Sequence, residues 1–353
     1  MRRSAVLPAL LALVLPLAAQ TQQPAYQEKV DVNVVLLDAI VTDAQGHQIL
    51  GLGKDDFVVK ENGVEQPLES VDYFTNRRLL DAREENAPFK VERVREDRYF
   101  VFFFDKPNDP GVLFDELNRA RDAARRFIDK RMLATDRVAI AGHDGRLKIY
   151  SDFTSDKKQL QRALDEALRF GPGLKSGGST DAPSILRTID SGSMVNHSGT
   201  VYEALDLLGD ALRPIRARKN LVLFSPGVLD PTEMVKAGMA VSRSPFLDPA
   251  LQSLNAANVS VYPIQLQRDV DLTPAIHQRL NEFAQATGGR YFEFNTSFEP
   301  ALTQIDNTNN GYYLLSYRTK HGASDAGFQK VSVSVRNQPK LRVNARAGYS
   351  YGG

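Results

Sequence analysis

The sequence predicts an α/β fold, in which a doubly wound and mostly parallel sheet is inserted in a small antiparallel β-sandwich formed by both chain ends. Three observations predict it. Tyr99–Phe104 is an almost unbroken apolar run, typical of a strand that is buried on both faces. Strand-like runs then alternate with helical patterns as far as residue 308. Period-two patterns, which indicate half-buried strands, lie before residue 76 and after residue 311.

Composition excludes several classes of protein. The 353 residues are 42% hydrophobic and 25% charged, as in a globular chain with a sizeable core. The net charge of +1 gives no field that would attract nucleic acid or an anionic membrane. The chain has no cysteine, which excludes thiol catalysis, zinc–thiolate sites, iron–sulfur clusters and disulfides. A lipoprotein anchor, which needs a cysteine, is excluded as well.

Residues 1–19 have the pattern of an export signal. Arg2 and Arg3 precede an apolar segment, Ala5–Leu15, that is too short to span a bilayer. Small residues then place cleavage near Ala19. No later segment is apolar for long enough to cross a membrane, so the mature chain is expected in the periplasm or outside the cell. An uncleaved N-terminal anchor is the alternative.

Residues 28–76 are predicted to form the N-terminal part of the sandwich. Val30–Thr42 is rich in β-branched residues and reads as a strand. Asn62 and Gly63 separate two β-like runs, which is the strongest short signal for a hairpin. The other strands expected here are Ile49–Leu52, Phe57–Glu61, Val64–Pro67 and Leu68–Phe74. Residues 77–97 are charge-rich and read as a linker.

Residues 98–310 are predicted to form the α/β domain. Its strands after Tyr99–Phe104 are expected at Arg137–Ala141, Leu147–Tyr150, Asn220–Phe224, Val259–Gln265 and Tyr291–Phe294. Its helices are expected at Leu113–Arg131, Asp156–Phe170, Thr200–Leu212, Pro249–Ala257, Pro274–Thr287 and Phe298–Thr308. Leu174–Ser198 shows no clear period and is expected to be a long functional loop, with at most a helical turn at Pro183–Ile189.

Residues 311–353 return to period-two patterning and are predicted to complete the sandwich. The three strands expected there are Tyr312–Tyr317, Gln329–Arg336 and Leu341–Ala347.

The order of these elements resembles a von Willebrand factor A domain. The strand that ends at Asp105, the Ser198-Gly199-Thr200 helix start and the strand that ends at Ser225 stand in the order and spacing of that family. The flanking stretches that begin DVNVVLLDAIVTD and YYLLSYRTK look like those of exported A-domain proteins abundant in Acidobacteria. The resemblance covers nearly the whole mature chain and implies a Rossmann-like doubly wound sheet.

The resemblance also implies a metal-ion-dependent adhesion site at the upper edge of this sheet. The family's site uses Asp-x-Ser-x-Ser, a later Thr and a later Asp to hold a divalent cation, usually magnesium, which can bind a partner's carboxylate. Asp105 matches the first Asp and Thr200 the Thr, but Pro107 and Asp109 stand in place of the serines and Pro226 in place of the last Asp.

Two interpretations of this edge follow. A modified Mg²⁺ site would use Asp105, Asp109 and Thr200 as its ligands. In the other interpretation the site is degenerate: Asp105 caps a helix or accepts hydrogen bonds from loop amides, and Thr200 forms a helix-capping box with Glu203. The degenerate site is favoured, because magnesium needs near-octahedral geometry that two or three ligands rarely define.

Other patterns carry less weight. Ser225 resembles an esterase nucleophile followed by Asp271 and His277, but the required glycine is Leu223 and no helix follows the turn. The histidines show no ligand spacing, and His143 is expected on the surface or in a hairpin turn, near the edge that carries Asp105. Arg213, Arg216, Arg218 and Lys219 follow a helix end, whose dipole they complement.

The predicted function is therefore an exported, non-enzymatic protein-interaction module for adhesion or scaffolding, which binds another protein through the upper edge of the A-like domain. The cofactor expectation is none, or Mg²⁺ if the modified site is real. The alternatives are a structural component of an envelope complex that docks through its β domain and, less favoured, a serine hydrolase that uses Ser225.

Overall fold

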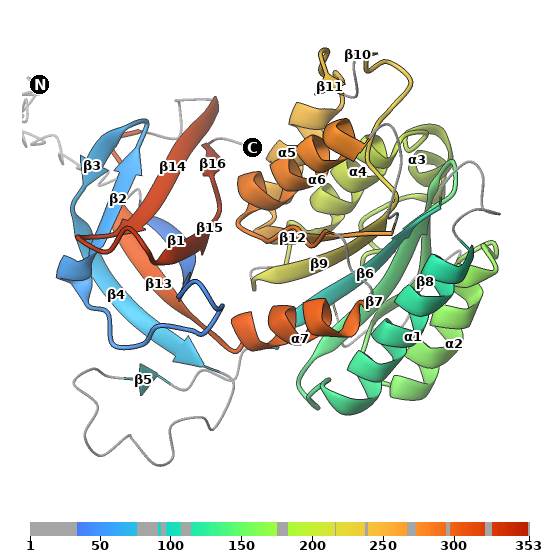
Figure 1. The fold of residues 1–353 in the computed structure, drawn as a ribbon, viewed down its shortest axis with the longest axis horizontal. Helices are drawn as coiled ribbons and strands as arrows, with labels where there is room; N and C mark the ends of the chain where they lie inside the picture. Colours follow the sequence, from blue (N-terminus) through green and yellow to red (C-terminus); the bar gives the residue numbers. More distant parts are fainter. Residues whose placement is uncertain are drawn as a thin grey trace, which may run out of the picture. The chain divides into compact units, whose positions relative to one another are not determined.

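The computed structural model describes residues 34–75, 91–92, 97–106, 114–174, 183–215, 217–236, 239–266, 273–293, 297–321 and 327–351. Figure 1 shows their strands and helices. The expected signal at residues 1–19, most of the expected linker, and Asp109 lie outside the described residues. In the part of the chain that is described, no helix is long and apolar enough to cross a membrane.

The mostly parallel sheet has five strands in the order β12-β9-β6-β7-β8. All neighbours are parallel except β7 and β8. The strand expected to be central, β6, does occupy the middle of the sheet. The bounds are β6 Tyr99–Asp105, β7 Arg137–His143, β8 Leu147–Thr154, β9 Lys219–Ser225 and β12 Val259–Gln265.

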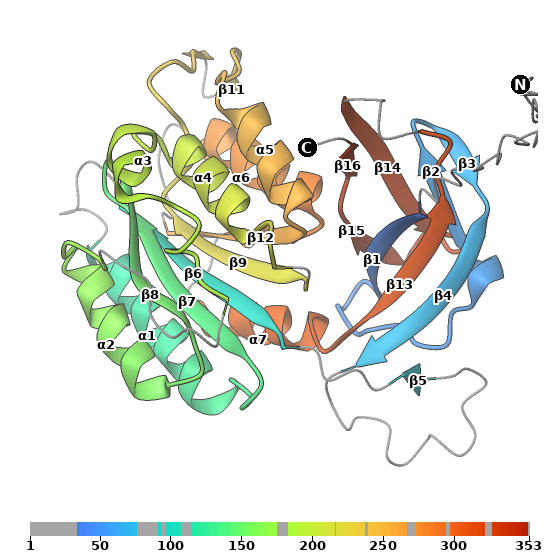
Figure 2. The ribbon, with the colours of Figure 1, turned by 180° about the vertical axis from the view of Figure 1, so that it is seen from behind.

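Side chains of β6 alternate between two helical layers. Phe100, Phe102 and Phe104 pack with α1, α2 and α7, whereas Val101 and Phe103 pack with α3, α4, α5 and α6. Figures 1 and 2 show these helices on opposite faces of the sheet. All seven residues of β6 are buried, so its continuous apolar run reflects cover on both faces. The bounds are α1 Phe114–Lys130, α2 Lys157–Leu168, α3 Ser191–Asn196, α4 Val201–Leu212, α5 Leu247–Ala256, α6 Thr273–Thr287 and α7 Glu299–Thr308.

Two expectations for this region were wrong in part, and two short strands were not expected. The predicted loop Leu174–Ser198 contains helix α3, which Asp190 caps by accepting a hydrogen bond from Ser193 N. Six residues are too few for a helical period to show in the sequence. Between β9 and α5 lie two short paired strands, β10 (Val235–Lys236) and β11 (Met239–Ala240). The expected strand Tyr291–Phe294 is reduced, in its described part, to one bridge between Phe292 and Ile264.

Both ends of the described chain contribute strands to the same antiparallel sheets. One sheet has the order β15-β1-β13-β4-β5 and the other β16-β14-β2-β3. Only β5 is parallel to its neighbour. A shared apolar cluster includes Leu37, Val59, Tyr313 and Val331 from four of these strands. The bounds are β1 Val34–Thr42, β2 Phe57–Glu61, β3 Val64–Gln66, β4 Leu68–Thr75, β5 Val91–Glu92, β13 Gly311–Arg318, β14 Gly327–Val335, β15 Arg342–Ala345 and β16 Gly348–Tyr351.

The hairpin predicted at Asn62-Gly63 joins β2 and β3, and both turn residues have positive φ, 49° and 85°. These are the values that a tight two-residue turn requires. The predicted strand Ile49–Leu52 is wrong, since only Gln48 makes a bridge, to Thr42. The hydroxyl of Tyr313 bonds two further backbone atoms of this segment: it donates to Ile49 O at 2.9 Å and accepts from Leu52 N at 3.1 Å.

Candidate functional site

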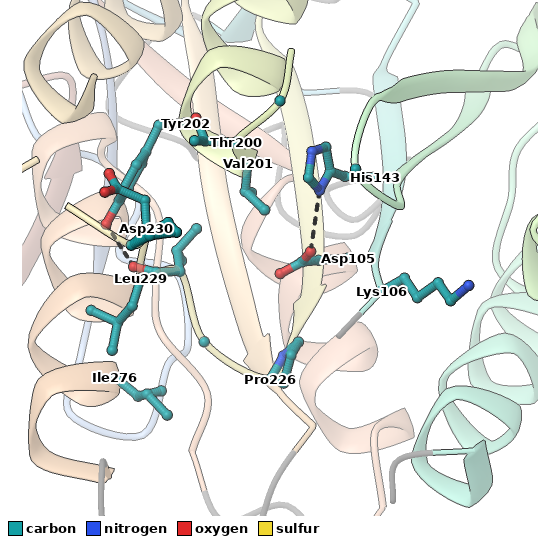
Figure 3. Close-up of a pocket in the computed structure, with 15 residues that line it drawn as sticks. Asp105, Lys106, His143, Thr200, Val201, Tyr202, Pro226, Leu229, Asp230 and Ile276 are labelled. Carbon is teal, nitrogen blue, oxygen red and sulfur yellow. Dashed lines mark hydrogen bonds and ion pairs between the residues drawn. The ribbon is translucent and has the colours of Figure 1, made fainter. Parts of the chain in front are cut away.

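A cavity of about 320 Å³ lies at the carboxyl ends of β6, β7 and β9, where open α/β sheets place their ligand sites. Figure 3 shows it, with Asp105 and His143 on one side and Leu229 and Ile276 on the other. Most of its wall is apolar and comes from the start of α4, the segment after β9, and α6. The apolar lining residues are Val201, Pro226, Val228, Leu229, Pro231 and Ile276.

Asp105 and Ser225 end the two neighbouring strands β6 and β9 and contact each other. Ser225 Oγ donates to Asp105 Oδ2 at 2.6 Å and accepts a hydrogen bond from Gly227 N at 3.0 Å. The parallel register that aligns Phe104 with Phe224 brings the two side chains together. Asp105 is 3% exposed and Ser225 is fully buried. Asp105 lines the floor of the cavity, and Ser225 supports it from behind.

His143 ends β7 and lies opposite Asp105 in the register. Its Nε2 is 3.0 Å from the carbonyl oxygen of Ser198, and its Nδ1 is 3.8 Å from Asp105 Oδ1. The expectation that His143 shares an edge with Asp105 is confirmed. The expectation of a surface or hairpin-turn position is wrong, because His143 is 7% exposed and ends a buried strand. Its partner Ser198 is 55 residues away, which no local pattern reveals.

Burial raises the pKa of Asp105 above its ordinary value of 3.8, and the interactions with His143 and Ser225 offset only part of this. A carbonyl oxygen can only accept, so His143 Nε2 must be the donor to Ser198. In the neutral ring, Nδ1 is then an acceptor that faces Asp105 Oδ1.

Thr200 caps helix α4 as the degenerate-site interpretation expects. Its Oγ1 accepts from Glu203 N at 3.1 Å, and its own N donates to Glu203 Oε2 at 2.8 Å. Its hydroxyl proton also faces Glu203 Oε2, at 3.0 Å. This is a complete capping box, so the side chain has its hydrogen-bond partners within the first turn of the helix.

These residues do not fit a hard divalent cation. Burial disfavours the charged form of Asp105, the hydroxyl of Thr200 is engaged by Glu203, and Pro226 has no side-chain oxygen to offer. Within the described ranges, no three His, Asp or Glu side chains are grouped to hold a metal ion. Asp109 lies outside those ranges, so the modified Mg²⁺ site of Asp105, Asp109 and Thr200 stays a prediction.

A buried polar network fixes the segment after β9 against α4 and α6. Tyr202 donates to Val228 O at 2.6 Å and lies 2.7 Å from Glu233 Oε2. Arg279 Nε donates to Glu233 Oε1 at 2.5 Å, with 3% and 0% of the two side chains exposed. Sequence reasoning missed this network because Glu233 and Arg279 are 46 residues apart and stand in no motif. It holds one wall of the cavity in place.

The esterase resemblance finds little support in the geometry. Ser225 is fully buried, whereas a serine nucleophile must be able to reach its substrate. His277 Nδ1 lies 3.0 Å from Glu293 Oε2. Asp271 lies outside the described residues.

Comparison with known proteins adds resemblances of fold at low identity. No family model matches the chain, and no curated protein matches it. A solved von Willebrand factor type A protein from Catenulispora acidiphila is 9% identical, with a TM-score of 0.41, over 93% of this chain and 76% of that chain. BatB from Bacteroides thetaiotaomicron is 13% identical, with a TM-score of 0.38, over 60% of this chain and 96% of the other. The vWF domain of the type V pili tip protein Mfa5 from Porphyromonas gingivalis is 12% identical, with a TM-score of 0.39, over 61% and 95%. At these values the description of the fold rests on the strand order and register themselves.

Proposed function

We propose that this chain is an exported, non-enzymatic protein-interaction module of the von Willebrand factor A type, with a degenerate metal-ion-dependent adhesion site. It binds another protein through the edge of the sheet at which β6, β7 and β9 end. In this proposal residues 98–310 form the binding domain, inserted in a β-sandwich made by residues 28–76 and 311–353. The sequence resemblance to exported A-domain proteins supports the export step.

The observation that carries the proposal is the mostly apolar cavity over Asp105. It lies at the position where this type of sheet binds ligands, and its floor is a hydrogen-bonded cluster rather than a set of metal ligands. Exposed apolar side chains occur in segments next to the cavity's lining residues in the chain: Val195 of α3, which precedes α4, is 54% exposed, and Met234 and Val241 after β9 are 54% and 55% exposed. Such residues suit contact with a partner protein.

The non-enzymatic part of the proposal rests on the state of Ser225. Its hydroxyl is buried and bonded to Asp105 and Gly227, so an attack on a substrate would first require this cluster to come apart. The hydrolase alternative predicts turnover of ester substrates that Ser225→Ala abolishes. A screen of the purified protein against such substrates tests it, and turnover of that kind would contradict the proposal.

A second candidate function uses the β domain. Phe328 of β14 and Val64 at the β2–β3 hairpin are 39% and 60% exposed, and edge strands can pair with another chain. In that case the protein is a structural part of an envelope complex, and the cavity has no role in binding.

Affinity capture with matched variants distinguishes binding at the sheet edge near Asp105 from docking through the β domain. The mature chain is used to capture proteins from the envelope and secreted fractions of its source, in parallel with Met234→Asp, Val241→Asp and Val64→Asp. The proposal predicts that the first two variants lose a partner that Val64→Asp retains. Loss in Val64→Asp alone would favour docking through the β domain.

A further inference from the structure

We propose that the cavity over Asp105 receives a lysine side chain of the partner polypeptide, with its ammonium group bridging Asp105 Oδ1 and His143 Nδ1. The inference rests on the proposed function and specifies the partner's chemistry. A metal-loaded adhesion site would bind a negatively charged carboxylate of the partner, whereas the site proposed here binds a positively charged ammonium group.

Two acceptor atoms face each other at the floor of the cavity. His143 Nε2 uses its proton on Ser198 O at 3.0 Å, which leaves Nδ1 of the neutral ring as an acceptor. Asp105 Oδ1 lies 3.8 Å from this Nδ1, beyond the range of a hydrogen bond. Figure 3 shows the ring and the carboxyl group directed at each other. A donor with several N–H groups that enters here can bond both atoms.

The second oxygen of Asp105 and the hydroxyl beneath it already have partners. Asp105 Oδ2 accepts the hydrogen bond from Ser225 at 2.6 Å, and Ser225 Oγ accepts from Gly227 N. The side chains of Asp105 and His143 are 5% and 8% exposed, so a ligand that reaches them is almost fully out of water. Charge-assisted hydrogen bonds are about twice as strong as neutral ones, and an ammonium supplies them.

The walls suit the rest of a lysine side chain. Val201, Val228 and Ile276 line the cavity and would contact the four methylene groups of the stem. The volume of about 320 Å³ exceeds what one such side chain needs. An acidic side chain would instead bring a second negative charge next to Asp105.

Charge on the lining residues has the required sign. The acidic lining residues are Asp105 and Asp230, and the basic one is Lys106. The Lys106 ammonium lies 4.1 Å from the centroid of the Phe170 ring, and Figure 3 shows this side chain directed away from Asp105. It therefore leaves the floor of the cavity open to another cation.

Peptide titration monitored at His143 tests the inference. The probes are acetyl-Gly-Gly-Lys-Gly-Gly-amide and the same peptide with Nε-acetyl-lysine, arginine or glutamate at its centre. The signal is the Cε1–H resonance of the His143 ring of the mature chain, assigned with His143→Gln. Asp105→Asn removes the carboxylate, and Asp122→Asn on α1 removes one carboxylate outside the cavity as the matched control.

The expected result is a saturable shift of the His143 resonance with the lysine peptide, at concentrations up to tens of millimolar. Asp105→Asn should weaken it by about tenfold or more, and Asp122→Asn should leave it unchanged. The four peptides are also compared on the wild-type chain, and this comparison is valid even if the Asp105→Asn variant fails to fold. No shift, an equal shift with the Nε-acetyl-lysine peptide, or a preference for arginine or glutamate would overturn the inference.

These outcomes differ from a failure of the proposed function. If cavity-dependent partner capture persists while the lysine peptide does not bind, only the lysine assignment is overturned. If the lysine peptide binds at His143 while capture depends on Val64 alone, the chemistry of the cavity stands and the proposed docking face is wrong.

Discussion

Ser225 Oγ and Asp105 Oδ2 form a 2.6 Å hydrogen bond that ties together the ends of the neighbouring strands β9 and β6. Asp105, which matches the first aspartate of the expected metal site, is therefore buried and accepts a hydrogen bond from Ser225 of β9. His143 completes the cluster from β7 on the other side. The cluster therefore gives the carboxyl group of Asp105 partners from both neighbouring strands.

Asp105→Asn is expected to stabilise the protein at high pH. Burial raises the pKa of Asp105, so the folded chain holds this proton more firmly than the unfolded chain, and the carboxyl lowers stability as pH rises above 3.8. The amide can accept from Ser225 and donate to His143 Nδ1 at any pH. Urea unfolding should show a larger gain at pH 8 than at pH 4. A variant less stable than wild type at pH 8 would contradict a raised pKa of Asp105.

Thr200→Ala is expected to destabilise helix α4 by about 1 kcal/mol, because it removes the acceptor for Glu203 N. Thr200→Ser keeps an oxygen in the capping position and is the matched control, with a loss of a few tenths of a kcal/mol at most. Urea unfolding measures both. Equal losses in the two variants would mean that the methyl group, and not the cap, matters at this position.

Lys219→Met is expected to stabilise the protein more at pH 6 than at pH 9.5. Burial lowers the pKa of Lys219 to about 7, although its ammonium donates to the carbonyl groups of Leu212, the last residue of α4, and of Ile215. Below pH 7 Lys219 is protonated in both the folded and the unfolded chain, so burial of its charge lowers the free energy of unfolding by the full amount. Above it the folded chain loses the proton first, so stability rises with pH toward 10.5.

The gain in Lys219→Met should be about 2–4 kcal/mol at pH 6 and should shrink at pH 9.5. Urea unfolding at the two pH values measures it. A loss of stability at pH 6 would mean that the carbonyl contacts outweigh the cost of burying the charge. Arg213→Met on the exposed end of the same helix, whose side chain is 50% exposed, is the control and should change stability little.

Glu61→Gln is expected to destabilise the antiparallel sheets by about 1–3 kcal/mol at pH 7. Burial raises the pKa of Glu61, but hydrogen bonds from Tyr317, Tyr349 and Thr319 more than offset it, so the pKa lies below 4.5. A lowered pKa gives stability that is present above pH 4.5 and is lost as pH falls through the folded value. The difference between variant and wild type should therefore narrow below pH 4. A constant difference across this range would contradict the role of the charge.

Local patterns predicted much of the fold. The apolar run at β6, the turn at Asn62-Gly63 and the capping pair Thr200 and Glu203 each lie within a few residues, and the structure contains all three. The candidate site depended on pairs of residues far apart in the chain. Asp144 and Gly145 made His143 read as part of a turn, whereas the register with β6 places it beside Asp105.

Other features of the site left no trace in the sequence. Helix α3 is shorter than two turns, and Glu233 and Arg279, which contact each other, are 46 residues apart in the chain. Burial of Ser225, which argues against a nucleophile, follows from the packing of β9 between β6 and β12. Such facts depend on tertiary packing and not on any residue pattern.

In the proposed function, the sheet edge at Asp105 binds a partner protein without a metal ion. A pH titration of the Asp105 carboxyl carbon in ¹³C-labelled protein, with and without Mg²⁺, tests it most directly. Asp105→Asn assigns the resonance. We expect the titration of Asp105 to have its midpoint above pH 3.8, and we expect added Mg²⁺ to leave this midpoint unchanged. A transition below pH 3.8 that shifts with added Mg²⁺, and no longer shifts in Asp109→Asn, would contradict it.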